Sequence, residues 1–172
     1  MTTGIEAATA SYCERWSGDL RGPVTVIDEA DAKARNKSGL PFGVVLGDPD
    51  EPDAYLDVDW GEGRVVVWFF GDGRMRTQRY TFERVEPERL FMAEVAVWDY
   101  PPDATAEFTS ATLAYFVSYQ QDGIVRQVER NYLTREETVV DVSDVELDIN
   151  WEGMPRFGDW AALARRDRGE SA

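Results

Sequence analysis

Short turns recur between Ala54 and Ile149, and they constrain this chain more than any other feature of its sequence. Three tripeptides carry glycine where a hairpin loop needs a positive φ; they are Gly61-Glu62-Gly63, Gly71-Asp72-Gly73 and Gln121-Asp122-Gly123. Glu86-Pro87-Glu88-Arg89 suits a four-residue turn with proline second. Because loops this short join neighbouring antiparallel strands, they predict one long meander.

Turn length fixes how the strands pair, and pairing decides which side chains share a face. Counting outward from the turns predicts these pairs: Leu56 with Trp68, Val58 with Val66, Trp68 with Arg76, Tyr80 with Val95, Tyr115 with Glu129, and Val117 with Gln127. A further turn at 134–137 would set Arg130 opposite Asp141 and Glu129 opposite Val142. Past Ser143 the alternation flips, which predicts a bulge there.

One face of the predicted sheet is expected to be the interior, because the other face carries an ion pair typical of solvent-exposed strands. That pair is Arg79 with Glu94, which lie diagonally across the ladder. The predicted interior holds a mixed aromatic and polar set: Trp68, Arg76, Gln78, Tyr80, Phe82, Asp99, Tyr115, Tyr119, Gln127, Glu129 and Asn131.

The whole chain, 1–172, is expected to be a single all-β domain: an antiparallel up-and-down β-barrel of about eight strands spanning 23–149. Thr3–Ser17 has a capping-box start and apolar residues at helical spacing, which predicts a helix that caps the barrel or acts as a lid. A short helix is expected over 159–166. It would cover an outward apolar patch; otherwise that patch would suggest a homodimer. The patch residues are Val65, Val67, Phe69, Met75, Met92 and Trp98.

Charge and composition exclude several classes of partner. The formal net charge is −15, which argues against nucleic acid and anionic membrane surfaces. No apolar run is long enough for a membrane helix, and the first ten residues lack an export signal. With Cys13 as the sole cysteine there is no internal disulfide, so a cytoplasmic location is expected.

The chain contains no histidine. This rules out a Ser-His-Asp nucleophile, a histidine-ligated haem and a zinc site built from histidine and cysteine. The carboxylates of 48–53 lack the EF-hand spacing, so no metal and no cofactor are expected. Any acid or base must then be carboxylate, tyrosine or lysine.

The predicted interior gives a candidate site. Glu129 beside Tyr115 and Gln127 would be the catalytic group, because a buried carboxylate needs hydrogen bonds or a shifted pKa. The predicted substrate-binding residues are Trp68, Arg76, Gln78, Tyr80, Phe82, Tyr119 and Asn131. Two other interpretations stay open: these polar groups only satisfy one another, and Trp68 with Arg76 is only a cation–π pair.

The order of elements resembles the lipocalin-like, or calycin, barrels, with a leading helix, Gly-rich hairpins and a trailing helix over 3–166. Gly22-Pro23-Val24 stands where secreted lipocalins carry Gly-x-Trp. The resemblance implies a barrel that holds a ligand, and a cytoplasmic subset of similar barrels acts as cofactor-free cyclases in natural-product pathways.

Three functions follow as hypotheses. The first is binding of an extended, largely apolar small molecule with cofactor-free cyclisation or isomerisation, driven by confinement and a few hydrogen bonds. The second is a non-catalytic carrier or sensor of such a molecule. The third is an interaction module with a filled core that docks a partner through an apolar patch.

Overall fold

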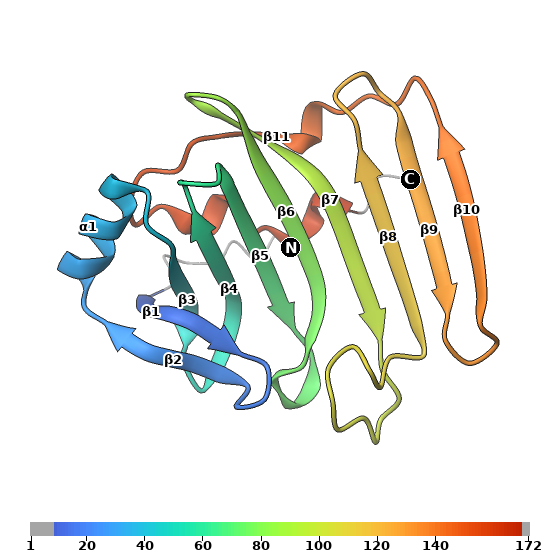
Figure 1. Cartoon of the computed structure of the whole chain (residues 1–172), viewed down its shortest axis with the longest axis horizontal. Helices are drawn as coiled ribbons and strands as arrows, with labels where there is room; N and C mark the ends of the chain where they lie inside the picture. The colour runs from blue at the N-terminus through green and yellow to red at the C-terminus, as the bar shows by residue number, and fades with distance from the viewer. Residues whose placement is uncertain (1–8, 170–172) are drawn as a thin grey trace, which may run out of the picture.

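The computed structural model describes residues 9–169, which form one open antiparallel β-sheet and a single α-helix (Figure 1). The strand order is β10-β9-β8-β7-β6-β5-β4-β3-β1-β2, and β11 pairs with the free half of β7. The predicted all-β meander is confirmed. The predicted closure into a barrel is not, because β2 and β10 lie at opposite ends of this order.

The strands are β1 Ala10–Ser17, β2 Gly22–Ile27, β3 Phe42–Asp48, β4 Glu51–Asp59, β5 Arg64–Phe70, β6 Arg76–Glu86, β7 Arg89–Asp99, β8 Leu113–Tyr119, β9 Val125–Asn131, β10 Glu136–Val142 and β11 Trp151–Gly153. The helices are α1 Glu29–Ser38 and four short 3-10 helices: η1 Asp72–Arg74, η2 Asp148–Asn150, η3 Trp160–Ala162 and η4 Arg166–Gly169. Within residues 9–169, no helix has the length and hydropathy to cross a membrane.

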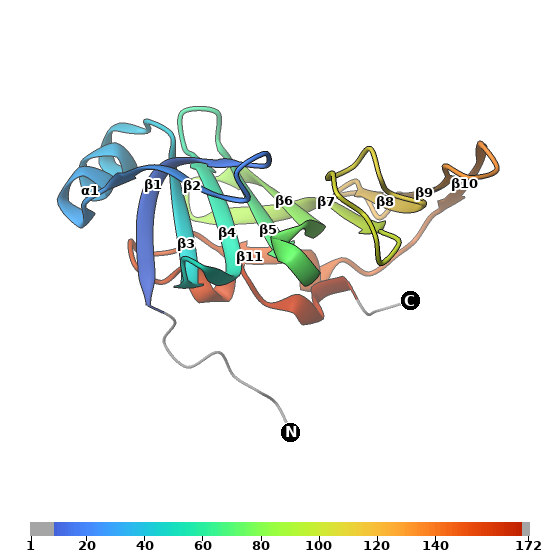
Figure 2. The same ribbon diagram turned by 90° about the horizontal axis from the view of Figure 1, so that it is seen from below.

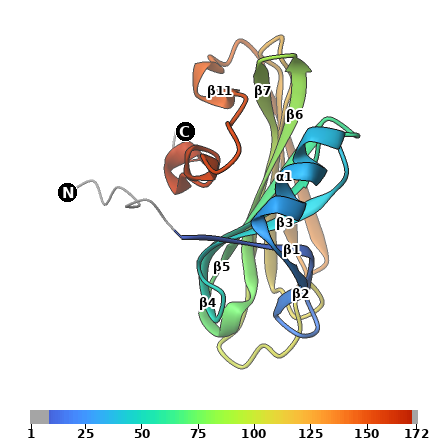
Figure 3. The same cartoon turned by 90° about the vertical axis from the view of Figure 1, so that its left-hand side faces the viewer.

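Three segments cover the two faces of the sheet. The C-terminal segment, Trp151–Gly169, crosses one face, which we call the inner face (Figures 2 and 3). The β1–β2 hairpin and the loop 100–112 pack on the other, the outer face. Figure 2 shows β8, β9 and β10 extending beyond the covered part. We call these three strands, residues 113–142, the wing.

The predicted N-terminal helix, Thr3–Ser17, is wrong for its described part, because Ala10–Ser17 is strand β1. Residues 3–8 lie outside the described part. Tyr12 packs in the inner-face core and its neighbour Cys13 in the outer-face core. A strand can bury both of its faces in this way, whereas one helical stripe cannot.

The predicted C-terminal helix over 159–166 is not confirmed either, and two 3-10 helices, η3 and η4, stand near that position. Trp160 and Leu163 are fully buried. They belong to one core cluster with four residues of the predicted apolar patch: Val65, Val67, Phe69 and Met92. The segment therefore covers that part of the patch, as predicted, and makes it the inside of the protein.

The face of β5 differs from the prediction because the preceding turn is one residue longer. Asp59 pairs with Arg64, so the turn is 60–63, and Asp59 Oδ1 accepts from the Glu62 N–H at 3.1 Å. Leu56 then pairs with Val67, where Trp68 was predicted. A slip of one residue moves every side chain to the other face.

Bulges shape the middle of the sheet. Phe69 pairs with Gln78 but Phe70 pairs with Arg76, so Thr77 is the extra residue on β6. The pairing of Tyr80 with Val95 is confirmed. These irregularities bend the sheet and decide which β6 side chains reach each face.

The wing confirms one predicted register and corrects another. Tyr115 pairs with Glu129 and Val117 with Gln127, as the Gln121 turn predicted. The next turn lies at 132–135 and not at 134–137, since Asn131 pairs with Glu136. Arg130 therefore pairs with Glu137, Glu129 with Thr138, and Arg126 with Asp141. β10 then ends at Val142, so the predicted bulge near Ser143 is absent from this strand.

Candidate functional site

The predicted interior set is divided between the two faces of the sheet. Trp68 and Arg76 lie on the outer face, which corrects their predicted place in the interior. The Arg76 guanidinium stacks 4.6 Å from the Trp68 ring centroid, so the predicted cation–π pair is present. Arg76 forms an ion pair with Glu107 of the loop 100–112.

Tyr80 and Phe82 are on the inner face, as predicted, but they are packed into the core and line no ligand space. Both are fully buried in the cluster that includes Trp160. The Tyr80 hydroxyl donates to the Arg166 carbonyl at 2.9 Å and accepts from Gln78 Nε2 at 3.1 Å. Side chains therefore fill the centre that the sequence predicted to hold a ligand.

The structure brings Tyr115, Gln127 and Glu129 together on the inner face of the wing. Their strands are adjacent, with Tyr115 directly opposite Glu129. Tyr115 is 38% exposed, and Gln127 and Glu129 are exposed as well. Partial desolvation, together with the carboxylates of Glu129 and Asp99, raises the pKa of Tyr115. The predicted trio exists, but it faces solvent.

The other two predicted wing residues have structural contacts. Tyr119 is half-buried and packs against a cluster of Phe91, Val125 and Leu147. This burial raises its pKa. Asn131 caps the turn that follows it, since its Oδ1 accepts from the N–H groups of Leu133 and Thr134, both at 3.0 Å. This capping explains why the turn comes two residues earlier than the sequence predicted.

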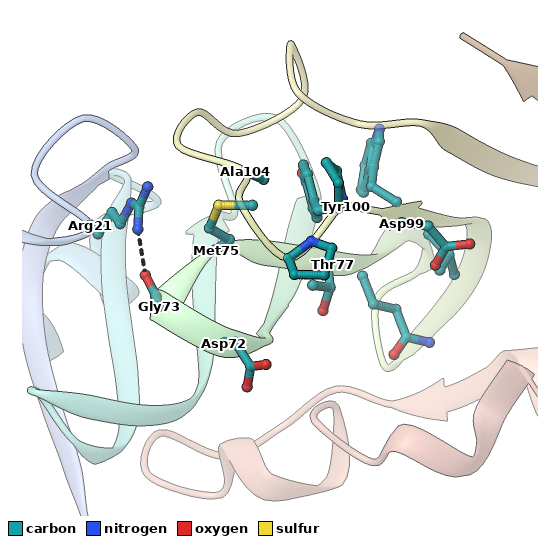
Figure 4. Close-up of a pocket in the computed structure, with 13 residues that line it drawn as sticks. Arg21, Asp72, Gly73, Met75, Thr77, Asp99, Tyr100 and Ala104 are labelled. Atoms are coloured by element: carbon teal, nitrogen blue, oxygen red, sulfur yellow. Dashed lines mark hydrogen bonds between the residues drawn. The ribbon is translucent and has the colours of Figure 1, made fainter. Parts of the chain in front are cut away.

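A pocket of about 480 Å³ opens at the ends of β6 and β7 (Figure 4). Gln78 and Asp99 are the predicted residues that line it. Arg21 closes one side by donating to the carbonyls of Gly73, at 2.9 Å, and Thr105, at 2.6 Å. The other residues that line it were not among the predicted site residues: Asp72, Met75, Thr77, Val97, Trp98, Tyr100, Pro101, Pro102 and Ala104.

The β10 strand is the feature that sequence reasoning missed. All of its residues are exposed, and it has a neighbouring strand on one side only within residues 9–169. Val139 is 50%, Val140 47% and Val142 41% exposed. Two cross-strand ion pairs, Arg126 with Asp141 and Arg130 with Glu137, lie on its outer face. The sequence signal was the run Glu136–Val142, which the predicted barrel over 23–149 would have left without a free edge.

Among the described residues, no group of three or more His, Cys, Asp or Glu side chains is placed to hold a metal ion. Comparison with protein-family models, curated proteins and solved structures finds no match to this chain. Function must therefore be argued from the geometry alone.

Proposed function

We propose that this protein is a non-catalytic binding module that receives a partner protein on its wing. One observation carries the proposal: β10 and most of β9 are exposed on both faces, whereas the C-terminal segment, the β1–β2 hairpin and the loop 100–112 pack on strands nearer the middle of the sheet. A strand that is uncovered on both faces contributes little burial to the fold, so folding alone does not explain three exposed valines.

The filled core supports this choice over an enclosed catalytic site. Tyr80, Phe82 and Trp160 occupy the space between the sheet and the C-terminal segment. Catalysis by confinement needs a cavity that excludes water around the substrate. The exposed trio of Tyr115, Gln127 and Glu129 offers surface recognition instead.

Site-specific photo-cross-linking tests the proposal. A photoreactive amino acid at Val140 in the full chain, expressed in its native cells, is expected to give one dominant cross-linked protein. The same residue at Val26 is the matched control, because Val26 is 76% exposed on β2, the strand at the other end of the sheet. Equal cross-linking at the two positions would contradict the proposal.

A second candidate function is small-molecule binding, which the pocket of about 480 Å³ favours. Its size suits a ligand pocket, and Asp99, which lines it, also contributes to the raised pKa of Tyr115 on the wing. Lipocalin-like ligand holding, cyclisation and isomerisation were expected in a barrel interior and stay predictions. Unchanged ligand binding and turnover in both Glu129→Gln and Tyr115→Phe would remove the trio from any such site.

A further inference from the structure

We infer that the partner contributes an extended, basic segment that adds to β10 as a further antiparallel strand. The inference rests on the proposed function and specifies its chemistry. Strand addition uses the unpaired backbone groups of a sheet edge for affinity and the alternating side chains for specificity.

Alternation of the ladder shows which backbone groups of β10 are free to pair. The Gln120 N–H bonds to the Ile124 carbonyl at 2.8 Å, and the Tyr132 N–H bonds to the Thr112 carbonyl at 3.0 Å. Ile124 and Tyr132 immediately flank β9, and both direct backbone groups to the β8 side. Even-numbered residues of β9 therefore direct their backbone groups to β8. Odd-numbered residues then bond to β10, because successive residues alternate sides.

The β10 partners of those odd-numbered residues are Glu136, Thr138, Val140 and Val142. Glu137, Val139 and Asp141 therefore direct their N–H and carbonyl groups to the open edge. Three consecutive alternate positions are available to an added strand.

The other edge of the sheet is protected, which makes β10 the favoured site. β2 contains Pro23, which lacks an N–H, and Thr25, whose φ of 54° departs from strand geometry. β10 contains neither proline nor a positive φ. An unprotected edge of this length invites pairing with another chain.

Charge selects which chain can pair. β10 carries Glu136, Glu137 and Asp141 and no basic residue, and the whole protein has a net charge of −15. A second copy would set Glu137 against Asp141 across the new ladder and bring two acidic proteins together, which is unfavourable. A basic segment instead extends the existing pairs with Arg126 and Arg130, because a carboxylate accepts several hydrogen bonds.

The side chains of β10 set the expected pattern of the partner. Lysine or arginine fits opposite Glu136, Glu137 and Asp141, while β-branched residues fit opposite Val139, Val140 and Val142. An antiparallel heptapeptide of this pattern is Val-Lys-Val-Val-Thr-Lys-Lys, with capped ends. Its matched control replaces each lysine with glutamate.

Titration of the full chain with these two peptides, followed by NMR or fluorescence anisotropy, tests the inference. The basic peptide is expected to bind and to weaken as salt is added, and the acidic peptide is expected not to bind. Val139→Pro removes one outward N–H without touching the β9 ladder. It should weaken binding at least about fivefold, the factor that one lost hydrogen bond gives. Val139→Thr keeps that N–H and should bind like the unmodified protein.

Glu136→Lys is a second variant for the case in which proline disturbs the fold. It lies on the surface, and it should weaken the basic peptide and strengthen the acidic one. Equal binding of both peptides, or equal binding to the protein and to Val139→Pro in its folded state, would overturn the inference. A dimer seen by sedimentation would also overturn it, because a second copy would then occupy the edge. If neither peptide binds while Val140 still cross-links a protein, strand addition fails and the proposed docking function stands.

Discussion

Glu107 accepts three hydrogen bonds from Arg76: from the backbone N–H at 2.8 Å, from Nε at 2.9 Å and from a terminal guanidinium nitrogen at 2.7 Å. Both side chains are largely buried, with 17% of Arg76 and 5% of Glu107 exposed. The Tyr100 hydroxyl donates to the Arg76 carbonyl and accepts from the Phe108 N–H. These contacts hold the loop 100–112 on the outer face.

Glu107→Ala should therefore destabilise the protein strongly, because it leaves the Arg76 guanidinium buried without its partner. We expect the free energy of unfolding to fall by about 3 kcal/mol in urea denaturation. Glu137→Ala is the matched control: it breaks the ion pair with Arg130, whose partners are each 49% exposed, and should cost less than about 1 kcal/mol. Similar losses in the two variants would contradict the buried geometry.

Trp160→Ala tests whether the C-terminal segment completes the core. Trp160 is fully buried and packs edge-on against Phe42 at 5.9 Å and Phe157 at 5.8 Å between centroids. Removing the indole should cost about 3 to 5 kcal/mol in thermal or urea unfolding. Arg165→Ala, an exposed position nearby, should change stability by less than about 0.5 kcal/mol. A Trp160→Ala protein as stable as Arg165→Ala would show that the segment does not pack there.

Cys13 should be unreactive in the folded protein. The thiol belongs to β1 of the β1–β2 hairpin and is fully buried in the cluster with Val45 and Tyr55, and this burial raises its pKa to about 11. A thiol-specific chromogenic reagent at pH 8 should label unfolded protein promptly and folded protein only as fast as the hairpin opens, because the thiolate is the reactive form. Rapid labelling without urea would contradict the packing.

The same pKa predicts how stability changes at alkaline pH. The thiol titrates near 9.0 when exposed and near 11 when folded, so below pH 9 both states keep the proton and folding is not penalised. Between these values only the unfolded state ionises, so stability should fall as pH rises. Cys13→Ala should lose this part of the pH dependence in urea denaturation between pH 8 and pH 11.

Glu129→Gln should lower the pKa of Tyr115 toward its ordinary value. The Glu129 carboxylate opposes ionisation of the neighbouring phenol, and the substitution removes that charge while partial desolvation and Asp99 remain. Subtracting the ultraviolet titration of the Glu129→Gln, Tyr115→Phe double variant from that of Glu129→Gln isolates the Tyr115 phenol without the carboxylate. Subtracting the titration of Tyr115→Phe from that of the unmodified protein gives the reference. Stability should change by less than about 0.5 kcal/mol, because both positions are exposed. An unchanged Tyr115 titration would mean that the two side chains do not interact.

Turns with a strong chemical signature could be predicted, and weaker ones could not. Gly123 set its hairpin, and the pair Tyr115 with Glu129 follows from it. The pair Tyr80 with Val95 agrees with the Pro87 turn because two register shifts between the turn and this pair cancel. The turn after Asp59 failed, since glycines at 61 and 63 suit a three-residue or a four-residue loop equally well. Nothing local in the sequence distinguishes these two lengths.

The candidate site failed for a different reason. Glu129, Tyr115 and Gln127 were correctly placed on one face, since their register was right. Their enclosure was inferred from barrel closure, which depends on the curvature of the whole sheet and on which strands meet at its ends. Bulges such as the one at Thr77 set that curvature, and they have no local signal in this sequence.

Sequence alone determined the antiparallel meander, the positions of most strands and the chemistry that a chain without histidine excludes, because turns and composition are local properties. Only the tertiary structure decided which side of β5 is inside. Val65, Val67 and Phe69 are as apolar as Val66, Trp68 and Phe70, so the strand has no alternation to read. The C-terminal segment decides between the two faces by burying the first three beneath Trp160 and Leu163, and this long-range packing leaves β10 as an open edge.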